Sequence, residues 1–229
     1  MRGGAARLLQ RATARTLACN MAAAANLRAL LSSAKRTRAI VEIWRRPIDK
    51  HRLNAAVVDH RNGLVLLNVL DDLILLNGFS VIRVADISAL ESKPKYAWFY
   101  GQALKKRKLA PRVPRGISLR SLPELLASAS RYFPLVTIHQ ERTRPGECEI
   151  GRSPSLNGGA LTMPTISPNA KWHSRPFRCR LSSVTKVDFG GRYEEALALV
   201  AGLQANNAID SDNYSAPLRA PSIARNRGR

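Results

Sequence analysis

The sequence predicts an α+β protein made of two tandem small antiparallel β-barrel-like units, each followed by a helix. Two groups of short apolar strands, separated by tight turns, alternate with segments of helical spacing. The two halves also align without gaps at a spacing of 97 residues, which places Arg83 on Arg180 and Tyr96 on Tyr193. A short-stranded meander usually closes into a barrel because closure removes exposed sheet edges.

The first unit is expected over residues 39–110. Asn62-Gly63 stands between two apolar runs, and both residues tolerate the positive φ of a type I′ turn, so a β-hairpin is expected there. The strands predicted for this unit are residues 54–60, 64–69, 73–76 and 79–85, with Asn77-Gly78 as a second tight turn. Trp98, Phe99, Ala103 and Leu104 then fall at helical spacing and predict a helix over residues 96–108.

A linker with a second helix is expected over residues 111–133. Ser121 is a suitable N-cap, Pro123 suits the first turn, and Glu124 can reach back to complete a capping box.

The second unit is expected over residues 134–204. Its predicted strands are residues 135–140, 148–152, 160–166 and 176–181. Asp188-Phe-Gly-Gly191 is expected to end a further strand and to open a helix that begins near Tyr193.

The excess positive charge lies mostly at the two ends of the chain. The net charge is +21, from 37 Lys and Arg against 16 Asp and Glu. Residues 1–38 contain no acid and predict a basic extension, either disordered or a transit peptide, and an upstream translated segment is the other interpretation. Residues 205–229 predict a disordered basic tail, and residues 22–38 a short peripheral helix.

Cysteine usage and hydropathy limit the compartment. Cys19, Cys148 and Cys179 form no C-x-x-C pair, which indicates free thiols. No run of 18 apolar residues exists, so no membrane span is expected. These features predict a cytoplasmic protein, or an organellar one if residues 1–38 are a transit peptide.

Several segments resemble known proteins. Val184-Thr-Lys-Val-Asp-Phe-Gly-Gly191 followed by Tyr193-Glu-Glu-Ala-Leu-Ala-Leu-Val200, together with residues 135–139 and 147–151, resembles a family of uncharacterised bacterial proteins over about residues 40–203. That resemblance implies no activity, cofactor or site residue. The strand pattern is also distantly similar to the Sm-like and SH3-like small barrels, of which the Sm-like ones bind RNA, although no Sm signature is present.

Basic residues form the main candidate binding site. Lys105, Lys106, Arg107 and Lys108 are followed by Arg112 and Arg115, which suits phosphate binding, although a solvated helix end also favours cations. Arg175, Arg178 and Arg180 make a second basic strip. The aromatic neighbours able to stack on bases, or to belong to the core, are Trp172, Tyr132 and Phe177.

Two other groups of residues are weaker candidates for a functional site. Asp49, His51, Asp59 and His60 would make a metal or acid-base site only if they converge in space. Cys148 with His139 suggests a thiol nucleophile, but a strand Cys is expected to face inward. No G-x-S-x-G, P-loop or G-x-G-x-x-G motif is present, so no catalytic residue, metal or cofactor is expected.

These observations predict a non-catalytic protein that binds RNA or another polyanion through its basic linker and strand residues. The alternative is a protein-interaction module that docks an acidic partner of unknown identity. The third hypothesis is a metal-dependent enzyme that uses Asp49, His51, Asp59 and His60.

Overall fold

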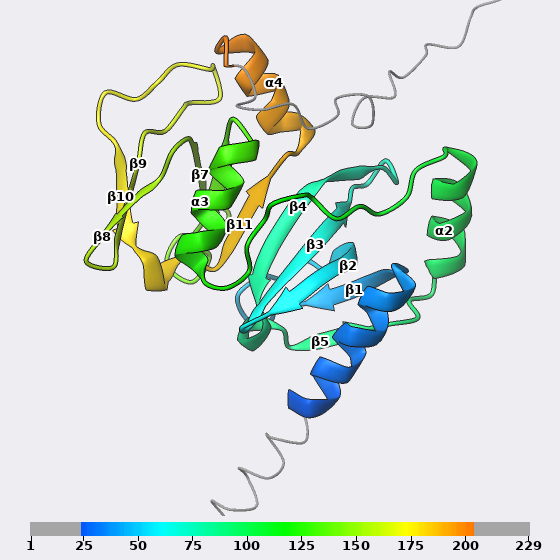
Figure 1. Ribbon diagram of the computed structural model, residues 1–229. Coiled ribbons are helices and arrows are strands. Elements are labelled where there is room, and N and C mark those ends of the chain that lie inside the picture. The colour runs from blue at the N-terminus through cyan, green and yellow to red at the C-terminus, as the bar shows by residue number, and fades with distance from the viewer. Residues whose placement is uncertain (1–23, 204–229) are drawn as a thin grey trace, which may run out of the picture.

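The structure is a computed structural model that describes residues 24–203 (Figure 1). An antiparallel sheet of eight strands has the order β5-β1-β2-β3-β4-β11-β6-β7, and a smaller sheet has the order β10-β9-β8. The strands are β1 (Ile40–Trp44), β2 (Leu53–Arg61), β3 (Leu64–Leu70), β4 (Leu76–Arg83), β5 (Ala89–Glu91), β6 (Val136–His139), β7 (Cys148–Gly151), β8 (Ser155–Asn157), β9 (Ala160–Met163), β10 (Phe177–Arg180) and β11 (Lys186–Phe189).

Four α-helices accompany the sheets in the described range. Residues 24–37 are helical, and the others are α2 (Ala97–Lys106), α3 (Leu122–Tyr132) and α4 (Arg192–Val200). Two 3-10 turns, η1 (Val84–Asp86) and η2 (Leu181–Ser183), precede β5 and β11. The predicted α+β class is therefore confirmed. No helix within residues 24–203 is long and apolar enough to cross a membrane.

The Asn62-Gly63 hairpin is confirmed. β2 and β3 pair antiparallel around it, with φ of 50° at Asn62 and 78° at Gly63, as a type I′ turn requires. The strand predicted over residues 73–76 is wrong. The Asp71 carboxylate accepts the amide N–H of Leu73 at 3.0 Å and of Leu75 at 2.9 Å, which holds these residues in a turn before β4 begins.

No closed barrel is found among residues 24–203, so the expected closure of each unit is wrong. β4 pairs with β3 on one side and with β11 on the other, and the partners of Val81 and Phe79 in β11 are Val187 and Phe189. Barrel closure would have covered the free edge of β4. β11, a strand about a hundred residues further along the chain, covers that edge instead. Gly78 allows this close approach, because a Cβ there would lie 2.5 Å from the amide nitrogen of Gly191.

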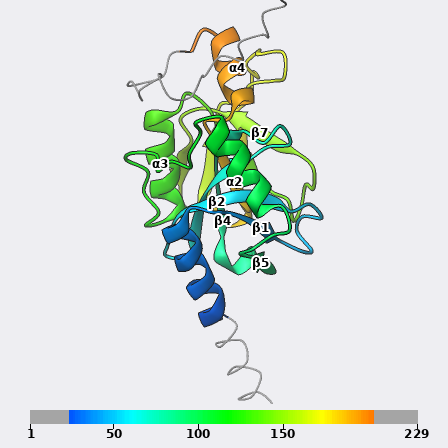
Figure 2. The same ribbon diagram turned by 90° about the vertical axis from the view of Figure 1, so that its right-hand side faces the viewer.

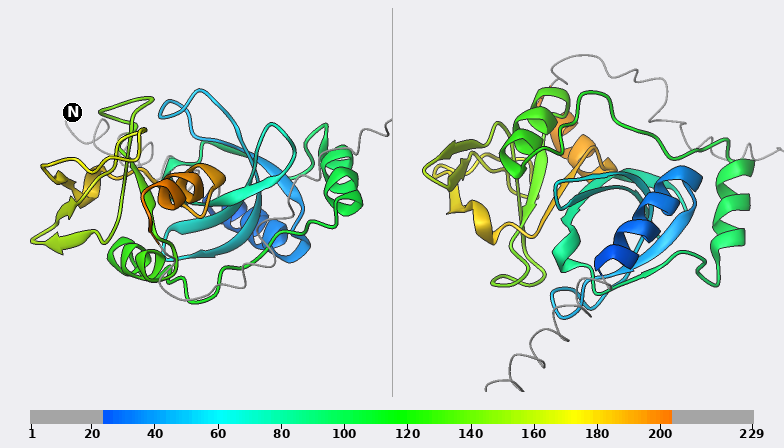
Figure 3. Two further views of the ribbon diagram at one scale, coloured as in Figure 1. Left: turned by 90° about the horizontal axis from the view of Figure 1, so that it is seen from above. Right: turned by 60° about the horizontal axis from the view of Figure 1, so that its bottom comes forward.

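The N-terminal helix belongs to the fold and is not peripheral. Leu31 is fully buried and Ala34 nearly so, and both pack against β1, β2 and β3 through Ile43, Val57 and Leu67. Figure 3 shows the helix lying against the curved strands. The part of the expected N-terminal extension that falls in residues 24–37 is therefore ordered, and residues 1–23 and the predicted tail from 205 onward lie outside the described residues.

The opposite face of the sheet is covered by α3. Ser121 caps this helix as predicted, with its hydroxyl accepting the amide N–H of Glu124 at 3.3 Å, and Pro123 lies in the first turn. The Glu124 carboxylate instead accepts a hydrogen bond from Ser118. The main core lies between this helix and the junction of the two halves, and includes Leu125, Leu126, Phe79, Phe133, Val187 and Phe189.

Candidate nucleic-acid interface

A long acid-free stretch of the folded region contains α2 and the linker after it. No acidic residue occurs between Glu91 and Glu124. The nine cations in that interval are Lys93, Lys95, Lys105, Lys106, Arg107, Lys108, Arg112, Arg115 and Arg120. Six of the nine predicted binding residues fall within this segment, so the segment is a continuous source of positive potential.

Helix α2 buries one side and exposes the other. Leu104 is buried and packs with Ile40 of β1, and Tyr100 is partly buried in the same cluster. On the outer side the Trp98 side chain is 77% exposed and Phe99 is 48% exposed. Figure 2 looks onto this helix. The apolar spacing that predicted the helix is correct, but two of its largest members face solvent.

Cations lie at both ends of this aromatic surface. Lys105 follows Trp98 by seven residues and Lys106 follows Phe99 by seven, so each pair lies on one line along the helix. Near the start of the helix, the Lys95 ammonium lies 5.4 Å from the centre of the Tyr96 ring. Lys105 and Lys106 are exposed. We call Trp98, Phe99, Lys105 and Lys106 the α2 surface.

Some cations in the last turn of α2 and just after it bind other parts of the chain, and others have no partner in the described residues. Arg107 donates from Nη1 to the carbonyl oxygens of Leu73 at 2.7 Å and Ile74 at 2.9 Å, which ties the helix end to the β3–β4 turn. Lys108, which follows the C-cap residue Arg107, has a φ of 57°. Within the described residues no hydrogen bond or ion pair engages the ammonium groups of Lys105, Lys106 and Lys108, which leaves them available to a ligand.

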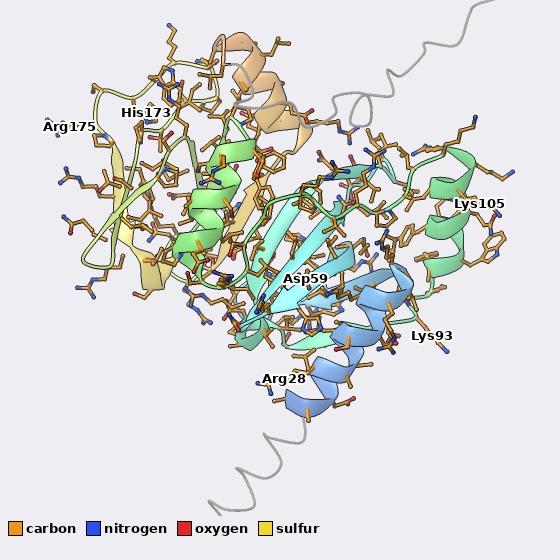
Figure 4. All side chains as sticks on the ribbon, in the orientation of Figure 1. Arg28, Asp59, Lys93, Lys105, His173 and Arg175 are labelled. Atoms are coloured by element: carbon orange, nitrogen blue, oxygen red, sulfur yellow. The ribbon has the colours of Figure 1, made fainter. Side chains whose placement is uncertain are left out.

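Arg175, Arg178 and Arg180 form a second basic surface on the small sheet. All three are exposed, and no acid occurs between Glu149 and Asp188. Figure 4 shows Arg175 and Lys105 at opposite ends of the molecule, so the structure does not bring the two predicted strips together. Of the three aromatic neighbours, Tyr132 and Phe177 pack against the main core. Trp172 is more exposed, with the Arg152 guanidinium 5.0 Å from its ring centre.

The Asp49, His51, Asp59 and His60 cluster is not assembled. His51 precedes β2, and Asp59 and His60 lie near its far end, so roughly 20 Å of strand separates them. Asp59 binds Lys35, and His60 contacts the hydroxyl of Ser32 at 3.1 Å. No group of three or more His, Cys, Asp or Glu side chains positioned to hold a metal occurs among residues 24–203.

Cys148 is exposed, so the expectation that it faces inward is wrong. It pairs with His139 across β6 and β7, but the His139 ring is hydrogen bonded to Asp188, with 2.7 Å between Nε2 and Oδ2. Although Cys148 is at the surface, partial desolvation of its thiol and the nearby Asp188 carboxylate raise the pKa of the thiol, which opposes formation of a thiolate. This arrangement is unsuited to a thiol nucleophile.

A buried ionic network lies at the junction of the halves, and no sequence pattern indicated it. Arg45, whose side chain is 1% exposed, donates to both oxygens of Glu141 at 2.5 and 2.7 Å. Its Nη2 also donates to Asp49 at 3.1 Å. Lys186 lies 3.3 Å from Asp188, which accepts from Ser80 at 2.6 Å. Lys186 also lies 4.0 Å from Glu141, so the network links the ends of β1 and β6 to β4 and β11.

The network shifts the pKa values of its carboxyl groups. Burial alone would raise the pKa of Asp188, but Lys186, His139 and Ser80 together hold the pKa well below its usual range. Burial also opposes ionisation of Glu141, and its hydrogen bonds from Arg45 and Thr185 outweigh this effect and lower the pKa. Both groups are thus carboxylates at neutral pH.

These shifts predict acid sensitivity. Because the folded pKa of Asp188 is below its unfolded value of about 4, its contribution to stability is present above pH about 4 and is lost as pH falls toward the folded pKa. We expect Asp188→Asn to make the fall of the unfolding free energy below about pH 5 shallower than in wild type. Urea titrations at several pH values test this, with Asp72→Asn, which alters an exposed carboxylate, as control. Equal slopes in wild type and Asp188→Asn would contradict it.

No protein-family model, no curated protein and no solved structure matches this chain. The resemblances to uncharacterised bacterial proteins and to the Sm-like and SH3-like barrels therefore stay predictions.

Proposed function

We propose that this protein is a non-catalytic nucleic-acid-binding protein whose partner is single-stranded RNA, bound at the α2 surface. The observation that carries the proposal is the 77% exposure of Trp98 on a helix face that also presents lysines. A large ring left in water costs hydrophobic free energy, which stacking on a base recovers.

The chemistry of the α2 surface favours an unpaired strand. Proteins that bind single strands combine a basic path for the backbone with rings on which bases stack. Trp98 and Phe99 provide the rings, and Lys105 and Lys106 lie about two helical turns away, within reach of neighbouring phosphates. Bases in a duplex are already stacked, so such rings add little to duplex binding.

Two matched variants of the full chain test the proposal. Lys105→Gln/Lys106→Gln removes two charges from the α2 surface, and Lys171→Gln/Arg175→Gln removes two from the other end. Fluorescent single-stranded RNA is titrated at several salt concentrations. We expect the first variant to bind more weakly. Its slope of log affinity against log salt should fall by about 1.4, because each phosphate that a cation no longer neutralises reduces the slope by about 0.7.

The control variant should keep the wild-type slope and affinity. Equal losses in both variants would indicate non-specific attraction by the net charge, and an unchanged Lys105→Gln/Lys106→Gln variant would exclude the α2 surface. Tighter binding of single-stranded DNA of the same sequence would correct the partner from RNA to DNA.

An acidic protein segment is the second candidate partner, since the same rings and lysines suit carboxylates as well as phosphates. Competition separates the two. An excess of polyglutamate displaces RNA from a surface that reads only charge, whereas bases stacked on Trp98 resist displacement because polyglutamate has no rings.

The two-unit plan also belongs to the proposal. β4, η1, β5 and α2 follow one another as β10, η2, β11 and α4 do, and Arg83 and Arg180 directly precede the two 3-10 turns. The first half is ordered β5-β1-β2-β3-β4, and the second β11-β6-β7 and then β8-β9-β10. In this correspondence β7 and β8 together take the place of β2. The matching order supports two copies of one small unit. Each copy would then be related to the Sm-like or SH3-like barrels but would not close into a barrel.

A further inference from the structure

Four strands, β5, β7, β8 and β10, end the two sheets in the described residues, and the free edges of β5 and β10 are the ones that correspond to the joint between the halves. β5 pairs with β1, and β10 pairs with β9. Within residues 24–203 neither strand has a partner on its other side (Figure 1). Such edges present unpaired amide and carbonyl groups, which another strand can satisfy.

The pairing of β4 with β11, which joins the two halves, indicates which kind of strand fits each free edge. β4 and β11 pair antiparallel, with Ile82 opposite Lys186 and Ser80 opposite Asp188. At the spacing of 97 residues, β10 is the counterpart of β4, and β5 is the counterpart of β11. The chain therefore makes this joint once within itself and leaves the same two kinds of edge open at its ends.

A side-chain clamp accompanies the internal joint. Arg83 donates to the carbonyl oxygen of Val184 at 3.0 Å from Nη2 and 3.2 Å from Nε, and to that of Leu181 at 3.4 Å. Its counterpart Arg180 is exposed, and its guanidinium makes no hydrogen bond within the described residues. The carbonyls that correspond to those of Val184 and Leu181 are those of Ile87 and Val84.

We propose that a second copy of this chain adds its β5 to the free edge of β10. The register of the internal joint places Cys179 opposite Ala89 of the second copy and Phe177 opposite its Glu91. Arg180 then donates to the carbonyls of the second copy's Ile87 and Val84. This inference rests on the two-unit plan and does not depend on RNA binding at the α2 surface.

Charge favours this register. Glu91 is exposed, and the register brings it opposite Phe177, two residues from the exposed Arg175 in the bend before β10, so opposite charges meet at this end of the joint. The contact is heterologous, since each copy offers a different strand at each side. Repetition therefore produces a ring or an open chain of copies, and not a two-fold dimer.

Disulfide cross-linking tests the register. The full chain carries Cys19→Ser and Cys148→Ser, keeps Cys179, and gains Ala89→Cys. Directly opposed residues in an antiparallel pair have Cα atoms about 4.5–5.5 Å apart, within the range of a disulfide. Mild oxidation without RNA is expected to give a ladder of dimers, trimers and larger species on a non-reducing gel.

Two controls fix the interpretation. Leu90→Cys in place of Ala89→Cys turns the thiol to the other face of β5, and Cys179→Ser removes its partner, so neither should give the ladder. No ladder with Ala89→Cys, or an equal ladder with Leu90→Cys, would overturn the proposal. Dimers that require only Cys179 would indicate a two-fold β10 contact and would overturn it as well.

Light scattering of the uncross-linked chain tests the clamp. Arg180→Ala is expected to weaken association by about tenfold or more, because hydrogen bonds from a charged donor are removed. Arg178→Ala removes a neighbouring exposed arginine whose counterpart in the internal joint is Val81, and should change association little. A wild-type chain that stays monomeric at all concentrations, or equal effects of the two variants, would refute the assembly while leaving the RNA titrations interpretable.

Discussion

Replacing Arg45 with alanine should lower the free energy of unfolding by about 3–5 kcal/mol, the usual cost of breaking a buried ion pair by removing one partner. The Arg45 side chain is 1% exposed and holds both oxygens of Glu141. Without it, Glu141 keeps a hydrogen bond from Thr185 and a more distant ammonium, that of Lys186 at 4.0 Å. Urea unfolding followed by circular dichroism measures the change.

Lys35→Ala is the matched control, because Lys35 also forms an ion pair but an exposed one, with Asp59. Exposed pairs contribute about 0–1 kcal/mol, so this variant should unfold close to wild type. A decrease below about 1 kcal/mol for Arg45→Ala would mean that the network does not hold β1 and β6 together.

Trp98→Ala should weaken binding of single-stranded RNA by about 1–3 kcal/mol, or about 5- to 150-fold, which is the range for removal of one base–aromatic stack. Stability should stay within about 0.5 kcal/mol of wild type, because the side chain is mostly exposed and supports little packing. Fluorescence anisotropy and urea unfolding of the same preparation provide both values.

Trp172→Ala is the matched control for Trp98→Ala. Trp172 is also a partly exposed tryptophan beside a cation, but it lies on the segment of Arg175, at the other end of the molecule (Figure 4). Its removal should leave RNA affinity near wild type. A larger effect from Trp172→Ala than from Trp98→Ala would transfer the binding site to the small sheet.

Local elements of this fold could be predicted from the sequence, and the long-range joint could not. The β2–β3 hairpin and the α3 cap depend on residues within four positions of one another, such as Asn62-Gly63 and Ser121. The pairing of Phe79 with Phe189 joins two strands that carry apolar residues at alternate positions, and this pattern does not specify which strand is the partner. The sequence therefore favours closure of each unit into a barrel. The first unit does not close, because β4 pairs with β11 of the second half.

The sequence predicts the cations of the candidate site, but it does not predict that aromatic rings are exposed beside them. Lys105, Lys106 and Lys108 stand out because no acid interrupts them. Helical spacing turns Trp98 and Phe99 by about 120° and 140° away from Leu104, but spacing alone cannot tell which of the two sides the sheet covers. β1 covers Leu104 and leaves Trp98 in solvent.

Buried charge is the other feature that sequence patterns hide. Arg45 follows β1 in a segment that looks like a basic surface turn beside Arg46. Its partner Glu141 is 96 residues away, and only the contact of β11 with both β4 and β6 brings that region of the chain toward β1. Long-range polar pairing of this kind needs the fold before it can be recognised.

Photo-cross-linking of bound single-stranded RNA to the full chain, followed by mapping of the modified peptide, tests the central claim most directly. Bases stacked on the α2 surface should attach to Trp98 or Phe99, and Lys105→Gln/Lys106→Gln should reduce the yield. Cross-links confined to the segment of Trp172, or no cross-link from a chain that binds RNA tightly, would contradict binding at α2.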